Sequence, residues 1–110
     1  MTSFKPPYYM VSFTSRLSEN ATEEEQQEYK KLSQLMVDLA QQQPGFLGFE
    51  SARDGTGLGI TISYWTDKSN IKDWKRQIDH RTAQSLGKSK FYQSYRVRIA
   101  HVESDYSFEK

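Results

Sequence analysis

Residues 46–65 read FLGFESAR, DGTG and LGITISYW in turn, which is two runs of strand-forming residues joined by a short glycine-rich link. A link of the DGTG type is typical of the turn that closes a β-hairpin. No helix pattern follows its glycines, so a phosphate-binding turn is not indicated. We therefore expect an antiparallel pair of strands over 46–53 and 58–65.

A long helix is expected before this hairpin. Thr22 and Glu25 have the spacing of a capping box, and the acidic run 23–25 places negative charge where the helix dipole is positive. The helix is predicted to run to about Gln42, where Pro44 and Gly45 stop it. Its apolar residues recur at steps of three and four: Tyr29, Leu32, Met36, Leu39 and Ala40.

A second helix is expected after the hairpin. Asp67 or Ser69 can cap it, and the apolar residues Ile71, Trp74 and Ile78 share one face. A separate helical stretch is predicted to follow from about His80 to Lys88.

A first and a last strand complete the pattern. The runs 8–16 and 92–103 alternate in character, with Tyr9, Val11 and Phe13 on one face of the first. The order strand, helix, strand, strand, helix, strand predicts an α+β, ferredoxin-like fold, an antiparallel four-stranded sheet with both helices on one face. We expect a second copy of the chain to cover the other face, giving a homodimer.

The length and composition limit the possible functions. The chain has 110 residues, 15 Lys and Arg against 14 Asp and Glu, and no cysteine. One domain over 8–110 is expected after a flexible leader, residues 1–7 with the Pro6-Pro7 pair. The balanced charge does not favour nucleic acid as a partner, and the absence of cysteine excludes thiolate metal sites and disulfides. No apolar run reaches the length of a membrane span, so we expect a cytoplasmic protein with no membrane partner.

Few residues suggest chemistry. His80 and His101 stand 21 residues apart and fit no metal-ligand spacing, so no metal site is predicted. We expect several ring side chains to meet at one end of the gap between helices and sheet, forming an apolar cleft for a flat aromatic ligand. The spacing alone favours a simpler interpretation, in which Trp74 packs in the core and His80 caps or faces solvent. The predicted cluster consists of Trp65, Trp74, His80, Tyr92 and Tyr95.

A set of short matches spread over residues 8–108 resembles one known family. The matches are QPGFLG (43–48), ESAR (50–53), SYW (63–65), Trp74 with His80, AQ (83–84), Gly87, FY (91–92) and YRVRIA (95–100). Together they resemble the antibiotic biosynthesis monooxygenase (ABM) domains, in particular a bacterial subgroup whose members mostly have no assigned substrate. The resemblance implies a dimeric α+β barrel, in a family that includes quinone-forming oxygenases and haem-degrading monooxygenases.

The haem-degrading branch of this family is matched only in part. Its site uses an Asn late in the first strand, a Trp on the second helix and a His that ligates the iron. By the resemblance, Ser15 stands at the Asn position, Trp74 matches the Trp, and Gln84, ten residues after Trp74, stands at the His position. Glutamine is a poor axial ligand for iron compared with imidazole. No cofactor is therefore predicted, and haem binding through His80 is the third and weakest alternative.

The quinone-forming branch implies chemistry without a metal or a flavin, in which an electron-rich phenol or anthrone is deprotonated and its anion reacts with oxygen. On this resemblance we expect His80 and Trp74 to be catalytic, with His80 as base or hydrogen-bond donor. The predicted function is oxygenation of a small aromatic or quinone-type compound, and the alternative is a non-catalytic ligand-binding or stress-associated protein. The residues expected to bind substrate are Trp65, Tyr95, Ser15 and Gln84.

Overall fold

The structure is a computed structural model that describes residues 4–83 and 92–110, with side chains for 4–79 and 93–110. The order of its elements confirms the predicted α+β, ferredoxin-like fold. The elements are β1 (Tyr8–Leu17), α1 (Glu23–Gln41), β2 (Phe46–Arg53), β3 (Leu58–Trp65), α2 (Lys68–Ala83) and β4 (Tyr92–Val102).

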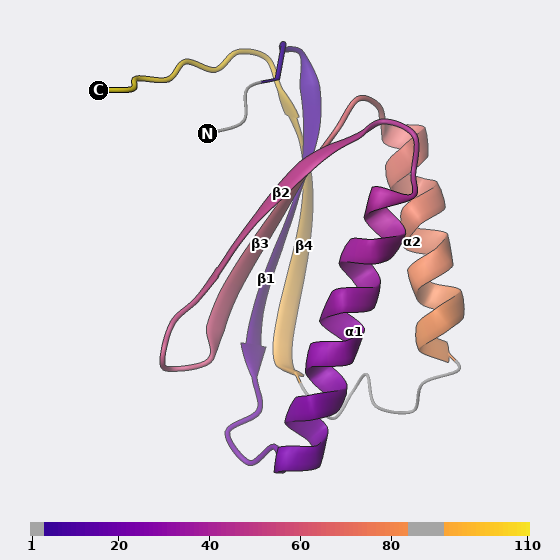
Figure 1. Cartoon of the computed structure of the whole chain (residues 1–110), viewed down its shortest axis with the longest axis vertical. Coiled ribbons are helices and arrows are strands. Elements are labelled where there is room, and N and C mark those ends of the chain that lie inside the picture. Colours follow the sequence, from indigo (N-terminus) through magenta and orange to yellow (C-terminus); the bar gives the residue numbers. More distant parts are fainter. Residues whose placement is uncertain (1–3, 84–91) are drawn as a thin grey trace.

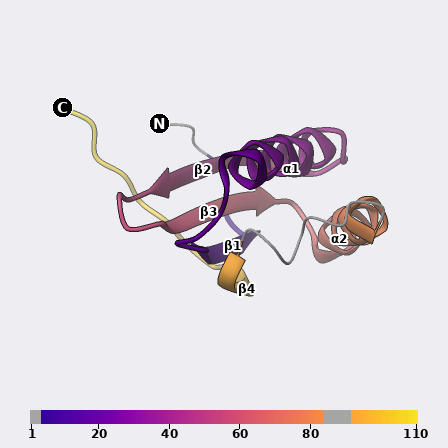
Figure 2. The same ribbon diagram turned by 90° about the horizontal axis from the view of Figure 1, so that it is seen from below.

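The four strands form one antiparallel sheet in the order β2-β3-β1-β4. Both helices lie on one face of this sheet, as the two views in Figure 1 and Figure 2 agree. Among the stronger contacts, α1 packs on β2, α2 packs on β3, and the two helices contact each other. The β4 side of this face is consequently the less covered one.

The register of the strands decides which side chains face the helices. Val11 of β1 lies opposite Ser63 of β3 and Ile99 of β4, so these three residues share one face. Because successive side chains point to opposite faces, the predicted alternation of Tyr9, Val11 and Phe13 is confirmed. The core lies on this face and consists of Val11, Ala40, Trp65 and Ile71, with Tyr9, Phe46 and Trp74 packed against it.

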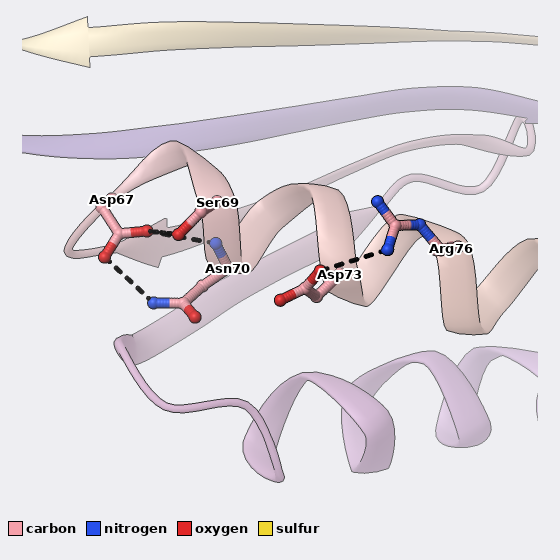
Figure 3. A network of polar contacts seen from close by, with 5 residues as sticks. All are labelled: Asp67, Ser69, Asn70, Asp73 and Arg76. Atoms are coloured by element: carbon pink, nitrogen blue, oxygen red, sulfur yellow. Dashed lines mark hydrogen bonds and ion pairs between the residues drawn. The ribbon is translucent and has the colours of Figure 1, made fainter.

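Both helices begin at the expected signals. The Glu25 N–H donates to Thr22 Oγ1 and the Thr22 N–H to Glu25 Oε1, each at 3.1 Å, which confirms the capping box of α1. At α2 the cap is Asp67, whose Oδ1 accepts the Asn70 N–H at 3.1 Å and the Ser69 hydroxyl at 2.6 Å (Figure 3). These two donors hold the pKa of Asp67 below its ordinary value.

The second helix differs from the prediction in one respect. We expected a separate helical stretch to start at His80, but α2 continues without interruption to Ala83. No proline or glycine lies between residues 68 and 83, so nothing in the sequence breaks the helix there. The remainder of the predicted stretch, residues 84–88, lies outside the described residues.

Gly45 forms the junction between α1 and β2. Its φ of 86° is in the left-handed region, and its carbonyl accepts the Thr66 N–H at 2.8 Å. A Cβ at this position would overlap with the side chains of Thr66 and Asn70 at the start of α2. The bare backbone of Gly45 therefore allows the end of α1 and the start of α2 to approach each other.

The face of the sheet away from the helices carries both aromatic and aliphatic side chains. Phe4 contacts the rings of Tyr8 and Tyr64, with centroids 5.5 and 5.1 Å apart. Burial and a hydrogen bond of 2.8 Å to Glu50 raise the pKa of Tyr64 to about 12. Ile60, which shares this face, is 43% exposed. The contact of Phe4 was not predicted, because Phe4 lies within the segment expected to be a leader.

Candidate functional site

A cavity of about 290 Å³ lies between the sheet and the two helices. This volume is at the lower end of the roughly 300–1,000 Å³ range of small-molecule sites. All six elements contribute to its lining, and most of the side chains are aromatic or aliphatic. They include Phe13 of β1, Leu32 and Met36 of α1, Phe49 of β2, Ile71, Trp74 and Ile78 of α2, and Tyr95, Val97 and Ile99 of β4.

Trp74 forms a fixed wall at one end of the cavity. Its indole Nε1–H donates to the carbonyl of Met36 on α1 at 3.0 Å. Its ring lies against Trp65, with centroids 5.1 Å apart and planes tilted by 37°. A hydrogen bond and a ring contact to two different elements leave the indole little freedom.

The cavity opens along β4. Tyr95, Val97 and Ile99 are 48%, 48% and 52% exposed, although they point to the same face as the core. The ring of Tyr95 stacks on Phe13 with centroids 5.4 Å apart and planes only 22° apart. Together the two rings provide an apolar floor against which an aromatic ligand can pack.

The cavity has a cation at the end away from Trp74. Arg53, the last residue of β2, crosses the sheet and donates from Nη2 to Ser15 Oγ and to Tyr29 OH, each at 2.9 Å. Its guanidinium carbon lies 5.3 Å from the centroid of the Tyr29 ring. Its Nη1 donates to the carbonyl of Gly57 in the hairpin.

A second cation lies at the rim of the cavity and is paired. Lys75 Nζ lies 2.7 Å from Asp79 Oδ2, one helical turn further along α2. The hydrogen bond and the charge of Asp79 raise the pKa of Lys75. Both side chains are at least half exposed, so water screens this pair and its contribution to stability is small.

The predicted site residues do not form a single cluster. Trp65 lies opposite Tyr9 near the start of β1, whereas Tyr95 lies opposite Ser15 near the end of β1. The expectation that Trp65 and Tyr95 meet at one end is therefore wrong. The reason is the antiparallel register, which places the end of β3 and the start of β4 at opposite ends of β1.

Two predicted ligand contacts lie behind the cavity wall rather than in it. Trp65 has no exposed surface and supports Trp74, and its Nε1–H donates to Ser63 Oγ at 2.9 Å. Ser15 is 2% exposed and accepts a hydrogen bond from the guanidinium of Arg53.

The two other predicted residues lie at or beyond the limit of the described chain. His80 is part of α2 and follows the cavity-lining Asp79, but its side chain lies outside the described part of the chain. Gln84 also lies outside the described residues.

Arg53 and Tyr29 are site residues that sequence reasoning missed. A local signal existed for Arg53, because alternation along β2 puts Phe49, Ser51 and Arg53 on one face. No local pattern shows that this face continues beneath Tyr29 of α1. The approach of Arg53 depends on strands and a helix that are distant in sequence.

Two further findings concern metals and membranes. Among the side chains that the structure describes, those of residues 4–79 and 93–110, no group of three or more His, Asp or Glu is placed to hold a metal ion. In the described part of the chain, neither helix is both long enough and apolar enough to cross a membrane.

Comparison with known proteins gives a family match and a relative over almost the whole chain. The model of the family described as "Antibiotic biosynthesis monooxygenase" matches residues 15–86. "Uncharacterized protein YqjZ" of Bacillus subtilis (strain 168) is 43% identical over 106 residues, which cover 96% of this chain and 89% of the relative.

Solved structures share the fold at low sequence identity. SnoaB, described as a cofactor-independent oxygenase from Streptomyces nogalater, matches with a TM-score of 0.60 at 11% identity, over 94% of this chain and 98% of its own. A "dimeric ferredoxin-like protein of unknown function" from Thermobifida fusca matches with a TM-score of 0.63 at 10% identity, over 91% and 95% of the two chains.

Proposed function

The chain belongs to the antibiotic biosynthesis monooxygenase family, and on this premise we propose that it oxygenates a small electron-rich aromatic compound without a metal or flavin cofactor. The observation that carries the proposal is the cavity between helices and sheet, with Trp74 as a fixed wall and the stacked rings of Phe13 and Tyr95 as a floor. Such a surface fits the face of a planar molecule. The description of SnoaB as a cofactor-independent oxygenase supports the reaction type.

The proposed reaction draws all its electrons from the substrate. A phenol or anthrone loses a proton to a base, and the resulting anion reduces dioxygen and forms a carbon–oxygen bond to it. The hydroperoxide then loses water and leaves a quinone, so one oxygen atom enters the product and the other leaves as water. The task of the protein is to hold the ring, to accept the first proton and to stabilise the anion.

Within this proposal the residues have distinct roles. His80 acts as the base or hydrogen-bond donor, and Trp74 packs against the ring of the substrate. Tyr95 contacts the substrate from the open side of the cavity, and Gln84 is the other proposed substrate contact. Trp65 and Ser15 act indirectly, because Trp65 supports Trp74 and Ser15 holds Arg53.

A second copy of the chain is the proposed partner, and it covers the sheet face away from the helices. Ile60 on that face is 43% exposed, and it shares the face with Met10, Ile62 and Tyr64. An apolar sheet face of this kind is normally covered by another layer. The description of the Thermobifida fusca structure as dimeric supports the same arrangement.

Oxygen uptake tests the proposed activity directly. The purified protein is incubated with a panel of anthrones and hydroquinones, and oxygen consumption is recorded. We expect uptake with at least one compound, and we expect His80→Ala to lower kcat by about 10²–10⁴, as for a lost acid–base group. His101→Ala is the matched control, because His101 lies on β4 against Tyr9 and is not among the residues that line the cavity. An equal loss of kcat in both variants, or oxygen uptake that is unchanged in His80→Ala, contradicts the assignment of His80 as the base.

A non-catalytic ligand-binding protein is the second candidate. It is favoured by the state of several polar groups in the described lining, which are already engaged within the protein. Trp74 Nε1–H donates to Met36, Ser63 Oγ accepts from Trp65, and Lys75 pairs with Asp79. Binding of a panel compound without oxygen uptake identifies this function instead.

A further inference from the structure

Arg53 brings a positive charge to the end of the cavity and is held there by neutral groups only. Its N–H groups donate hydrogen bonds to Ser15 Oγ of β1, Tyr29 OH of α1 and the Gly57 carbonyl of the hairpin. The side chain thus contacts three separate segments, which fixes the direction of its fork. Fixing a long side chain loses rotamer entropy, so a residue free in solvent rarely shows such a set of contacts.

The sheet makes room for this guanidinium. Gly59 of β3 lies opposite Arg53, and a Cβ at Gly59 would overlap with the guanidinium carbon and nitrogens. The absence of a side chain at Gly59 lets the planar group lie against the backbone of the strand. The strand pairing therefore leaves a space at Gly59, and the guanidinium of Arg53 occupies it.

The charge of Arg53 has no acidic partner among the described residues. The ion pairs there join Lys75 to Asp79 and Arg76 to Asp73, and neither includes Arg53. An arginine stays protonated at any physiological pH. Nη1 and Nη2 make the three hydrogen bonds, and within this same part of the chain Nε–H has no protein acceptor. Arg53 is exposed, so a ligand would replace only water.

The charge stands at a definite distance from the aromatic wall. Val11, which packs in the core beside Trp74, and Ser15, which contacts Arg53, are four residues apart on β1. Four residues of strand span about 13 Å. Phe13 lies between the two ends, and the ring of Tyr95, which stands opposite Ser15, stacks on it. The cavity is therefore mainly apolar, with the Lys75–Asp79 pair at its rim and the Arg53 cation at one end.

From this juxtaposition we infer that the ligand is a planar aromatic acid, whose carboxylate or equivalent oxyanion pairs with Arg53 while its ring system lies toward Trp74. The inference rests on the proposed function, because it assumes that the cavity is the substrate site. Three of the five guanidinium hydrogens are already engaged, so the oxyanion would accept from the free Nε–H, and charge-assisted hydrogen bonds of this kind are the strong ones. Anchoring the acid at one end fixes which ring carbon reaches the other end.

A matched pair of probes tests the inference under oxygen-free conditions, where no turnover interferes. The probes are 2-naphthoate and 2-naphthamide, which have nearly the same shape and differ in charge. Binding is followed by calorimetry and by quenching of tryptophan fluorescence. We expect the wild type to bind the naphthoate about tenfold or more tightly than the naphthamide. We expect Arg53→Met to bring this ratio close to one and to leave naphthamide binding intact.

The controls separate the local effect from changes in net charge or folding. Arg16→Met removes the same charge from the neighbouring position of β1, which faces away from the helices, and should preserve the preference. Arg53→Gln removes the charge but keeps a hydrogen-bonding group, so it serves if the methionine variant does not fold. Arg53→Lys keeps the charge without the fork and should retain part of the preference.

Each outcome has a distinct meaning. Equal binding of both probes by the wild type, or a preference that survives in Arg53→Met and Arg53→Gln, overturns the inference and leaves the aromatic site in place. Failure of both probes to bind overturns the inference and the proposed use of the cavity together. A preference that depends on Arg53, without oxygen uptake by any panel compound, supports the inference and contradicts the oxygenase.

Discussion

At the scale of single residues, two glycines determine how closely parts of the molecule approach each other. Gly59 leaves the space that the Arg53 guanidinium occupies, and Gly45 leaves the space between the end of α1 and the start of α2. Gly45 also has a left-handed φ of 86°, which costs other residues about 1–2 kcal/mol. Gly45 therefore tolerates a side chain far less than a glycine in an open turn does, whereas a Cβ at Gly59 would displace the flexible guanidinium of Arg53.

Replacing Gly45 tests this difference. We expect Gly45→Ala to lower the free energy of unfolding by about 2 kcal/mol or more, because the strained φ adds to the overlap with Thr66 and Asn70. Gly55→Ala is the matched control, since no atom lies within 4 Å of a Cβ there and its φ is not positive. Urea unfolding of both variants measures the difference, and equal losses would show that the junction tolerates a side chain.

At the scale of elements, the start of α2 depends on one side chain. Asp67 accepts hydrogen bonds from the Ser69 hydroxyl, the Asn70 N–H and the Asn70 side-chain amide (Figure 3). Asp73 on the same helix makes an exposed ion pair of 3.6 Å with Arg76. The two carboxylates therefore differ in their effect on stability although they are close in sequence. Asp67 caps the N-terminus of α2, whereas Asp73 forms an ion pair that water screens.

The paired variants Asp67→Ala and Asp73→Ala test this at pH 7. Loss of the cap should lower the Tm by about 4–6 °C, whereas loss of the exposed pair should change it by no more than about 1 °C. The pKa of Asp67 is lowered from 3.8, so its stabilising effect is complete above that pH and is lost as the pH falls through the lower folded value. Thermal scans from pH 7 to pH 2 should show the wild type and Asp67→Ala converging in acid. A constant gap would assign the effect to something other than the charged cap.

The elements themselves were predictable because their signals are local. The capping box at Thr22, the DGTG turn and the alternation of each strand depend on neighbours in sequence, and both hairpin strands were predicted with the observed bounds 46–53 and 58–65. The site was predictable only in part. Trp74 follows from helical phase, but the distance between Tyr95 and Trp65 follows from strand register, and the contact of Arg53 with Tyr29 follows from packing. No local sequence pattern predicts either the separation of Tyr95 from Trp65 or the contact of Arg53 with Tyr29.

At the scale of the whole molecule, the sheet has two unlike faces. One face packs on the helices and lines the cavity, and the other, which carries Ile60 and Tyr64, has neither α1 nor α2 over it (Figure 2). The proposed dimer buries the second face. Assembly and ligand binding then depend on opposite sides of the same strands, so substitutions can affect them separately.

Substitutions at two residues with nearly the same exposed fraction test this separation. Ile60 and Phe49 are 43% and 42% exposed and lie on opposite faces of the sheet. We expect Ile60→Asp to weaken dimerisation by about tenfold or more, because each of the two copies would place an unpaired charge in the interface. Phe49→Asp should leave the dimer intact and weaken ligand binding. Analytical ultracentrifugation across a concentration series measures the dimer, and a monomeric wild type at micromolar concentration would contradict the proposed partner.

The strand order also sets the timing of folding. β1 lies between β3 and β4, and its pairing with β4 joins residues 8–17 to residues 92–102. Contacts between such distant segments form only after a large loss of chain entropy, so folding is expected to be slower than that of a helical bundle of the same length. During synthesis one edge of β1 stays unpaired until β4 leaves the ribosome. An unpaired strand edge readily pairs with other chains, so the nascent chain is exposed to aggregation until synthesis of β4 is complete, which a helical bundle with local contacts avoids.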